Sequence, residues 1–167
     1  GADGAMVISP YYFSLPDSAV LNFYDRLAER MEGDLLLYNF PDRTGYDLGP
    51  DLIYSLAMRH RNIVGIKDTV AKMEHTRAII QKVKKDRPDF LIFSGFDEFC
   101  GHNVLSGGDG CIAGLSNFAP EIASGYAQMA REENLQGMKE YQRKIDALME
   151  IYSVAPAFIP TIKKAVC

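Results

Sequence analysis

Cysteine is scarce in this 167-residue sequence. The three cysteines, Cys100, Cys111 and Cys167, are an odd number and include no Cys-x-x-Cys pair. This pattern argues against a disulfide framework and against a zinc site. A reducing, cytoplasmic compartment fits such cysteine usage best.

Basic charge, clustered histidines and long apolar runs are also lacking. The formal net charge is −4 and the longest basic stretch is the short patch at residues 82–87, so the chain offers no field for nucleic acid. His60, His75 and His102 are scattered in segments predicted to be helical, and we interpret them as surface or packing residues. No apolar run approaches the length of a membrane span, and no charged and then apolar leader opens the chain. We therefore expect a soluble protein that binds neither nucleic acid nor a membrane.

What the sequence does have is a regular alternation of apolar strands and amphipathic helices. The length and the 47% hydrophobic composition suffice for a sizeable core in a single domain spanning residues 1–167. Short apolar runs predict strands at residues 5–9, 35–40, 63–67, 90–95 and 111–114. Apolar positions at helical spacing predict helices at residues 17–33, 50–60, 70–85, 98–107, 120–133 and 135–154, with a loop at 42–49 and one more helix from Pro160.

Nearly continuous apolar strands joined by single helices indicate right-handed βαβ units and a parallel sheet. The sheet could be open and doubly wound, which the length favours, or an eightfold barrel, which typically needs about 250 residues. The phosphate-binding fingerprints of the open fold are absent, because the glycine-rich segment at residues 107–110 precedes a strand instead of opening a helix. In either fold the site lies at the carboxyl ends of the strands, where polar and aromatic residues gather in this sequence.

One lysine, Lys67, ends the apolar run at residues 63–66. A lysine at a strand end that is shielded from solvent on several sides loses hydration. This loss disfavours the charged ammonium form and lowers the pKa of the lysine towards the working pH. The neutral amine would then be a nucleophile that forms a Schiff base with a ketone or an aldehyde. The alternative is that Lys67 extends from the strand end into water, as most lysines do.

Five segments carry a resemblance to a known family. They are Pro10-Tyr11-Tyr12, Leu37-Tyr38-Asn39-Phe40-Pro41-x-Arg43-Thr44-Gly45, Val64-Gly65-Ile66-Lys67-Asp68, Ser94-Gly95-Phe96-Asp97 and Gly107-Gly108-x-Gly110-x-Ile112. Their order and spacing resemble the successive strand-end motifs of the dihydrodipicolinate synthase and N-acetylneuraminate lyase family, over nearly the whole chain. Any one of these motifs is a weak signal, but five in order are a strong one.

The resemblance implies a fold and a chemistry. The fold is a TIM (β/α)8 barrel, of which this chain carries about five βα units, the fourth to the eighth, plus the C-terminal helices. The chemistry is that of a class I aldolase acting on pyruvate, with no metal or cofactor, in a homo-oligomer that is a dimer or a tetramer. The first three βα units have no counterpart here, and neither does the family's hydroxyl motif for the pyruvate carboxylate, so we expect a piece of a larger enzyme.

The resemblance assigns three catalytic residues. Lys67 is the Schiff-base lysine, Tyr38 is the phenol that transfers protons, and Tyr12 is a tyrosine that reaches across a dimer interface to complete a proton relay. The chemistry asks for such a phenol, because carbinolamine dehydration and the aldol step each move a proton. The alternative for Tyr38 is an amphipathic tyrosine of the core.

The resemblance also assigns substrate contacts. Arg43 resembles an arginine that grips a substrate carboxylate, which suits its bidentate fork, although an exposed loop arginine is often only solvated. Gly95, Asp97 and Glu98 resemble residues that hydrogen-bond sugar hydroxyls in the lyase branch, while the two acids could instead cap a helix N-terminus. Ile112 resembles a residue whose backbone contacts pyruvate.

These residues leave the branch of the family open. We predict reversible aldol cleavage of a 2-keto-3-deoxy sugar acid, or a similar 2-oxo acid, to pyruvate and an aldehyde. Arg43 keeps open the alternative of dihydrodipicolinate synthase, which condenses pyruvate with aspartate semialdehyde. An alternative of another class is a catalytically silent fragment or a relative that binds small acids without turnover.

Overall fold

The computed structural model describes residues 1–167 and contains one five-stranded parallel sheet. The strands are β1 (Gly4–Ile8), β2 (Asp34–Asn39), β3 (Ile63–Asp68), β4 (Leu91–Ser94) and β5 (Gly110–Cys111). Each strand pairs with its neighbour in sequence, in the order β1-β2-β3-β4-β5. A doubly wound sheet reverses its strand order at a switch point, and this sheet does not. The sheet is therefore part of a (β/α)8 barrel, and the open sheet that the chain length favours is wrong.

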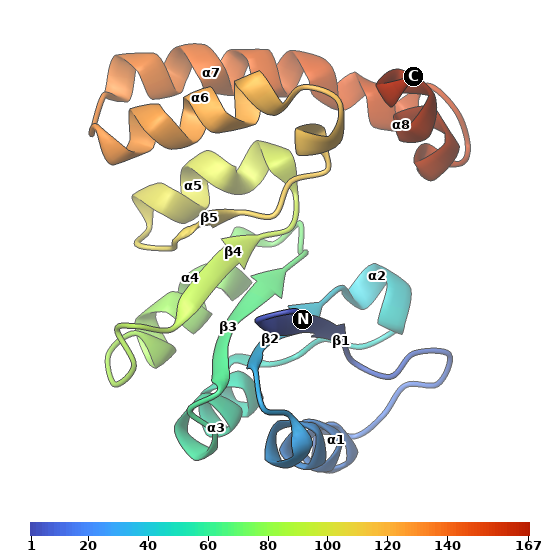
Figure 1. The fold of residues 1–167 in the computed structure, drawn as a ribbon, viewed down its shortest axis with the longest axis vertical. Coiled ribbons are helices and arrows are strands. Elements are labelled where there is room, and N and C mark those ends of the chain that lie inside the picture. The colour runs from blue at the N-terminus through green and yellow to red at the C-terminus, as the bar shows by residue number, and fades with distance from the viewer.

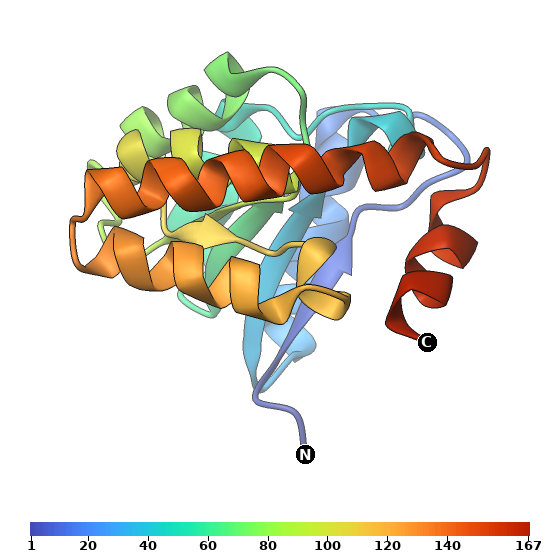
Figure 2. The same ribbon diagram turned by 90° about the horizontal axis from the view of Figure 1, so that it is seen from above.

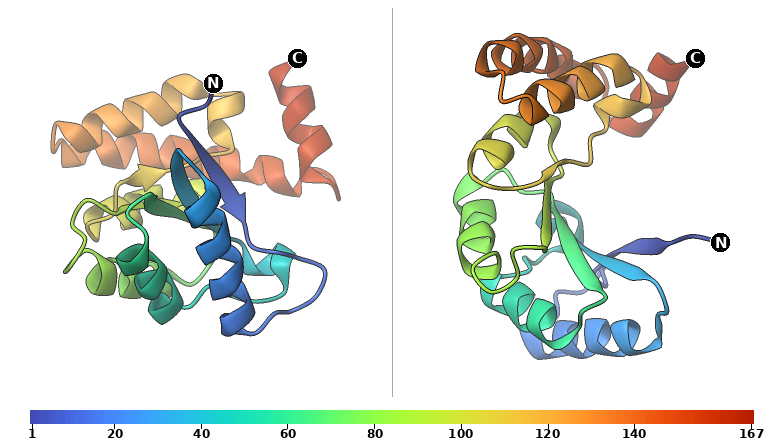
Figure 3. Two further views of the ribbon diagram at one scale, coloured as in Figure 1. Left: turned by 60° about the horizontal axis from the view of Figure 1, so that its bottom comes forward. Right: turned by 60° about the vertical axis from the view of Figure 1, so that its left-hand side comes forward.

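Helices cover one face of the sheet, as Figure 3 shows in its right-hand view, where they form an arc around the strands. The connecting helices are α1 (Asp17–Arg30), α3 (Pro50–Arg59), α4 (Met73–Val83) and α5 (Cys100–Leu105). Strand residues that point to this face, such as Leu37, Ile66 and Ile92, are fully buried against α1, α3 and α4 in one apolar cluster. The opposite face of the sheet carries no helix in this chain.

The chain after β5 forms a second, smaller cluster. It contains α6 (Pro120–Arg131) and α7 (Leu135–Leu148), which lie side by side and antiparallel in Figures 1 and 2. The terminal helix α8 (Phe158–Val166) follows and contributes no residue to this cluster. Leu115, Tyr126 and Ile145 are buried where α6 and α7 pack together and onto the end of the sheet. Short 3₁₀ turns connect these parts: η1 (Asp97–Phe99), η2 (Leu115–Asn117) and η3 (Met149–Ser153).

Several predicted boundaries are wrong. The predicted loop at residues 42–49 contains a short helix, α2 (Pro41–Thr44), because Pro41 occupies its first turn and Gly45 ends it with φ 81°. The helix predicted at 135–154 ends at Leu148 and continues as the 3₁₀ turn η3, and α8 begins two residues before Pro160. No helix in the structure combines the length and apolarity needed to cross a membrane.

Candidate active site

A cavity of about 530 Å³ lies at the carboxyl ends of the strands. Its walls come from β2, β3, the short helix α2, the turns after β3, β4 and β5, the 3₁₀ turn η3 and the first residue of α8. Seven of the eight residues that the sequence nominates line it: Tyr38, Arg43, Lys67, Gly95, Asp97, Glu98 and Ile112. Residues that are up to 74 positions apart in the chain, from Tyr38 to Ile112, thus share one cavity.

Lys67 and Tyr38 are cross-strand neighbours in the register of β2 and β3. The Nζ atom of Lys67 lies 4.5 Å from the centroid of the Tyr38 ring, a cation–π distance. Both side chains are half-buried and belong to the face of the sheet opposite to the helices, whereas the preceding Leu37 and Ile66 are buried under them. The lysine therefore points into the cavity beside a phenol, and the alternative of a lysine extended into bulk water is wrong.

Tyr12 is the one nominated residue outside the cavity. Its side chain is 85% exposed, its backbone has φ 85°, and its ring meets that of Phe13 edge to face at 4.7 Å between centroids. Tyr11 and Phe13 are also exposed. Within a single chain Tyr12 does not reach Lys67, so its catalytic assignment stays a prediction about a second copy of the chain.

Asp97 is buried and both of its carboxylate oxygens are engaged. Oδ1 accepts a hydrogen bond from the backbone N–H of Leu115 at 3.0 Å, and Oδ2 accepts one from the hydroxyl of Tyr152 at 3.1 Å. The expectation that Asp97 caps a helix is wrong, because neither η1 nor α5 has a side-chain cap. Asp97 instead ties η1 to η2, through Leu115, and to η3, through Tyr152. Glu98, half-buried beside it, lines the same cavity.

Tyr152 lines the cavity and lies at the end of the helix predicted at residues 135–154, where its apolar spacing indicates packing. Burial, followed by the negative charge of Asp97, raises the pKa of Tyr152 well above its ordinary value, so the hydroxyl stays protonated and donates to the carboxylate. The only sequence signal was a tyrosine at the end of an apolar stripe. Its partner lies 55 positions earlier in the chain, a separation that local patterns do not connect.

Gly95 brings the backbone against Thr69. A Cβ atom at Gly95 would lie 1.8 Å from Thr69 Oγ1, so only glycine fits there. The Thr69 hydroxyl is buried, has no hydrogen-bond partner and lines the cavity. Ile112 lies across the cavity, with its N–H donating to the carbonyl of Ser94 at 2.9 Å. The sequence analysis missed Thr69, although it directly follows the Lys67-Asp68 pair.

Arg43 stands at the mouth of the cavity. Its guanidinium carbon lies 5.7 Å from the Phe40 ring centroid and 6.0 Å from that of Phe158, so two aromatic faces hold it. The side chain is exposed and forms no ion pair with a carboxylate of this chain. Its donors are free for an external acceptor. No group of three or more His, Cys, Asp or Glu side chains is arranged to hold a metal ion.

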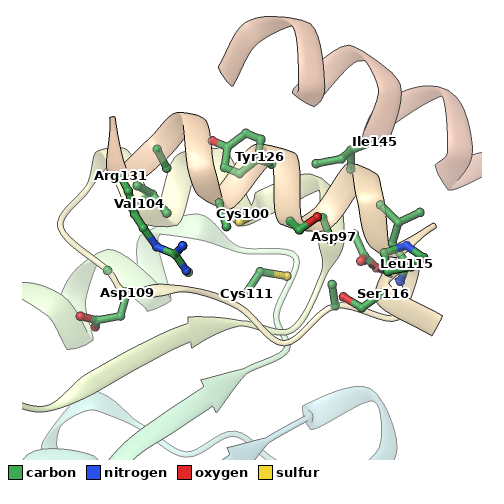
Figure 4. Close-up of a pocket in the computed structure, with 18 residues that line it drawn as sticks. Asp97, Cys100, Val104, Asp109, Cys111, Leu115, Ser116, Tyr126, Arg131 and Ile145 are labelled. Atoms are coloured by element: carbon green, nitrogen blue, oxygen red, sulfur yellow. Dashed lines mark hydrogen bonds between the residues drawn. The ribbon is translucent and has the colours of Figure 1, made fainter. Parts of the chain in front are cut away.

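A second cavity, of about 480 Å³, lies between β5, α5 and α6 (Figure 4). Cys100 and Cys111 face one another in it and Arg131 points into it, while Asp97 is shared with the first cavity. The hydrogen bond of the Cys111 thiol with Cys100, in which Cys111 keeps the proton, raises the pKa of Cys111, as does burial, and neither cysteine forms a disulfide. This cavity contains neither Lys67 nor Tyr38, so the candidate active site is the first cavity.

A lysine and a phenol that meet at the carboxyl ends of parallel βα units define the class of (β/α)8-barrel proteins with a lysine-centred site. The sequence profile described as the dihydrodipicolinate synthetase family matches residues 1–167. The chain therefore belongs to that family, as its five motifs predict.

Two kinds of relative agree with this. A protein of Escherichia coli (strain K12) named "Probable 2-dehydro-3-deoxy-D-pentonate aldolase YjhH" is 39% identical over 163 residues, which are 98% of this chain and 54% of that protein. The crystal structure of YagE, a prophage protein of the dihydrodipicolinic acid synthase family from E. coli K12 in complex with pyruvate, matches with a TM-score of 0.96 at 34% identity. That match covers 99% of this chain and 56% of the other.

A crystal structure of dihydrodipicolinate synthase from Thermotoga maritima matches with a TM-score of 0.89 at 30% identity, covering 93% of this chain and 53% of that one. The chain thus spans about half the length of the curated relatives and solved structures that it matches.

Proposed function

We propose that this chain supplies the Schiff-base half of the active site of a pyruvate-dependent class I aldolase. The single observation that carries the proposal is the contact between Lys67 and Tyr38 inside the cavity. An amine beside a proton-transferring phenol is what imine chemistry requires. Residues 1–167 would act as one domain, and the site residues keep the roles that the family resemblance assigns to them.

In the proposed reaction, the Lys67 amine attacks the keto carbon of a 2-oxo acid and forms a carbinolamine. Loss of water gives an iminium, which withdraws electrons from the adjacent carbon. In the cleavage direction a base removes the proton of the 4-hydroxyl, the bond between carbons 3 and 4 breaks, the aldehyde leaves, and the electron pair enters the iminium as an enamine. Protonation of the enamine carbon and hydrolysis release pyruvate and restore Lys67. We assign the transfer of these protons to Tyr38, whose ring centroid lies 4.5 Å from Lys67 Nζ.

For the substrate we propose a 2-keto-3-deoxy sugar acid. Glu98 and the free hydroxyl of Thr69 offer hydrogen-bonding groups that suit a polyol chain. The name of the E. coli relative, a 2-dehydro-3-deoxy-D-pentonate aldolase, supports the same class of substrate. Tyr12 would complete the proton relay from a second copy of the chain, in a cytoplasmic homo-oligomer.

The alternative is dihydrodipicolinate synthase activity, which one observation favours: Arg43 presents free donors at the cavity mouth, where a second carboxylate would enter. Replacing Arg43 by Ala separates the two. The change should cripple a synthase by 10-fold or more in kcat/KM for the aldehyde, and it should leave cleavage of a sugar acid nearly unchanged.

Borohydride trapping tests the proposal itself. After incubation with pyruvate and borohydride, mass spectrometry of a protein digest should find one reduced pyruvyl adduct, on the peptide that contains Lys67. An adduct on another lysine would overturn the assignment of Lys67, and binding of pyruvate without any adduct would favour a silent relative that binds small acids.

A further inference from the structure

Behind the Lys67–Tyr38 pair, on the helix-facing side of the sheet, lies a buried cluster of polar side chains that the proposed chemistry does not use. Its centre is Asp68, whose side chain is fully buried. The carboxylate accepts hydrogen bonds from Asn39 Nδ2 at 2.8 Å, Thr76 Oγ1 at 2.6 Å and His75 Nδ1 at 3.1 Å. A buried carboxylate is costly unless its lone pairs and its charge are satisfied, and here three donors surround it.

Asn39 links this cluster to β2. Its amide nitrogen donates to Asp68 and, at 2.6 Å, to Asp47, while its Oδ1 accepts from the N–H of Leu48 at 3.1 Å. Every hydrogen-bonding group of the Asn39 side chain is thus used. Asn39 and Asp68 are cross-strand partners, one position beyond the Tyr38 and Lys67 pair.

The geometry also defines the charge of His75. Nε2 lies 3.1 Å from the carbonyl oxygen of Leu48, which can only accept, so Nε2 carries a hydrogen. Nδ1 lies 3.1 Å from Oδ2 of Asp68, and an ionised carboxylate also only accepts, so Nδ1 carries one as well. With an ionised Asp68 both ring nitrogens face acceptors, which favours the imidazolium form, and its positive charge would offset the buried negative charge of Asp68. His75 is not the surface or packing residue that the sequence analysis predicts.

Burial by itself lowers the pKa of His75, but the hydrogen bond and charge of Asp68, with Asp47 and the Leu48 carbonyl, outweigh it and raise the pKa above its usual value. The titratable groups that face the ring are Asp68 from β3 and Asp47 from the segment before α3, at 3.1 and 3.4 Å. Both are acids, so both favour the charged form.

We propose that His75, Asp68 and Asn39 are positioning residues, which lock the ends of β2 and β3 in register and thereby hold Tyr38 against Lys67. Successive strand residues point to opposite faces, so a link between Asn39 and Asp68 on one face fixes the spacing of Tyr38 and Lys67 on the other. The catalytic meaning of this lock rests on the proposed function. The claim that these residues hold Tyr38 against Lys67 does not depend on the proposed function.

The first test measures the geometry without any reaction. In ¹³C–¹H NMR the ε-methylene of Lys67 should show an upfield ring-current shift from Tyr38. His75→Gln should reduce that shift, whereas His60→Gln should not change it. His60 is a matched control because it also bonds an aspartate, Asp25, at 2.7 Å, but between α1 and the end of α3. An unchanged Lys67 signal in His75→Gln would overturn the proposal.

The wild-type protein provides a test that needs no variant. ¹⁵N NMR should show both ring nitrogens of His75 protonated at pH 6, and the Lys67 ε-methylene should move with the same pH midpoint as the His75 nitrogens. A singly protonated His75 ring at pH 6, or a Lys67 signal that does not follow its titration, would contradict the proposal.

Borohydride trapping then connects the lock to the chemistry. At saturating pyruvate His75→Gln should form adduct about 10- to 100-fold more slowly with little change in the half-saturating concentration, because misplacement by a fraction of an ångström costs rate more than binding. The difference in trapping rate between the wild type and His75→Gln should shrink as the pH rises and the wild-type His75 ring loses its proton. No adduct with the wild type would reject the proposed function and leave the NMR tests to decide the lock. A normal trapping rate in His75→Gln, with a normal wild type, would reject the lock.

Discussion

The two faces of the sheet differ in what their side chains do. On the helix-facing side, Leu35, Leu37, Ile66 and Ile92 are closed off from solvent and belong to the large apolar cluster. On the opposite side, the side chains are half-buried or exposed and include Lys67. Because strand residues alternate, one strand contributes to stability with one set of positions and to chemistry with the other. Core packing and the proposed chemistry are therefore separated here at the level of adjacent residues.

The polar cluster around Asp68 is the exception to this division. It lies on the helix-facing side of the sheet, where burying an apolar residue would cost less free energy than burying a charged one. The Asp68 carboxylate there accepts three hydrogen bonds. Its place directly behind the reactive pair is the reason to assign it to positioning.

The largest expected effect is on adduct formation at Lys67, on the sheet face that no helix covers. Lys67→Ala should abolish the borohydride-trapped pyruvate adduct completely, because no other amine lines the cavity. The melting temperature should stay within a few degrees of the wild type, since Lys67 is half-buried and forms no ion pair. Mass spectrometry and thermal unfolding of the same sample check both statements. A full adduct in this variant would remove Lys67 from the proposed role.

Tyr38→Phe keeps the ring under Lys67 and removes only the hydroxyl. Turnover should fall by about 100- to 10,000-fold, the usual contribution of general acid–base catalysis, with KM for the 2-oxo acid nearly unchanged. Steady-state kinetics measures this, and Tyr54→Phe, whose hydroxyl bonds the exposed Asp86 on another face, is the control. Equal turnover in both variants would leave Tyr38 as a packing residue.

The sharpest test of the two faces uses neighbours on β2. Leu37→Ala should lower the free energy of unfolding by about 3 kcal/mol, because it leaves a cavity in the core. Leu36→Ala, on the half-open face, should cost about 1 kcal/mol or less. Urea unfolding of both variants measures the difference. Equal losses would show that the two faces are equally packed in solution.

The smallest expected effect concerns pH. The folded pKa of His75 is raised, so its contribution to stability is fully present below the unfolded value of about 6.5 and is lost as the pH rises through the folded pKa. The wild type should therefore exceed His75→Gln in urea midpoint at pH 5.5, and the gap should narrow towards pH 9. His102→Gln, at an exposed position of α5, should show no such narrowing. If the difference in urea midpoint widened with rising pH instead, the buried His75 ring of the folded protein would be neutral.

Much of the fold follows from local pattern. Strand and helix order, Lys67 at the end of β3 and Tyr38 at the end of β2 agree with the apolar runs and helical spacing. The errors lie where local signals compete. The length argument favoured an open sheet, and proline and glycine at positions 41 and 45 made a helical turn inside a predicted loop. His75 and Tyr152 were missed because their partners are supplied by other elements.

The sequence by itself determined the alternation of elements and the family, and it nominated Lys67 and Tyr38 for the site, because hydrophobic periodicity and short motifs are local properties of a chain. Only the tertiary structure decided that Asp97 is held by Tyr152 and Leu115, that His75 lies between Asp68 and the Leu48 carbonyl behind Lys67, and that Tyr12 lies outside the cavity. Those facts depend on which side chains meet after the strands are in register. Burial and hydrogen bonding between distant segments, which no local pattern encodes, fix that register and those partners.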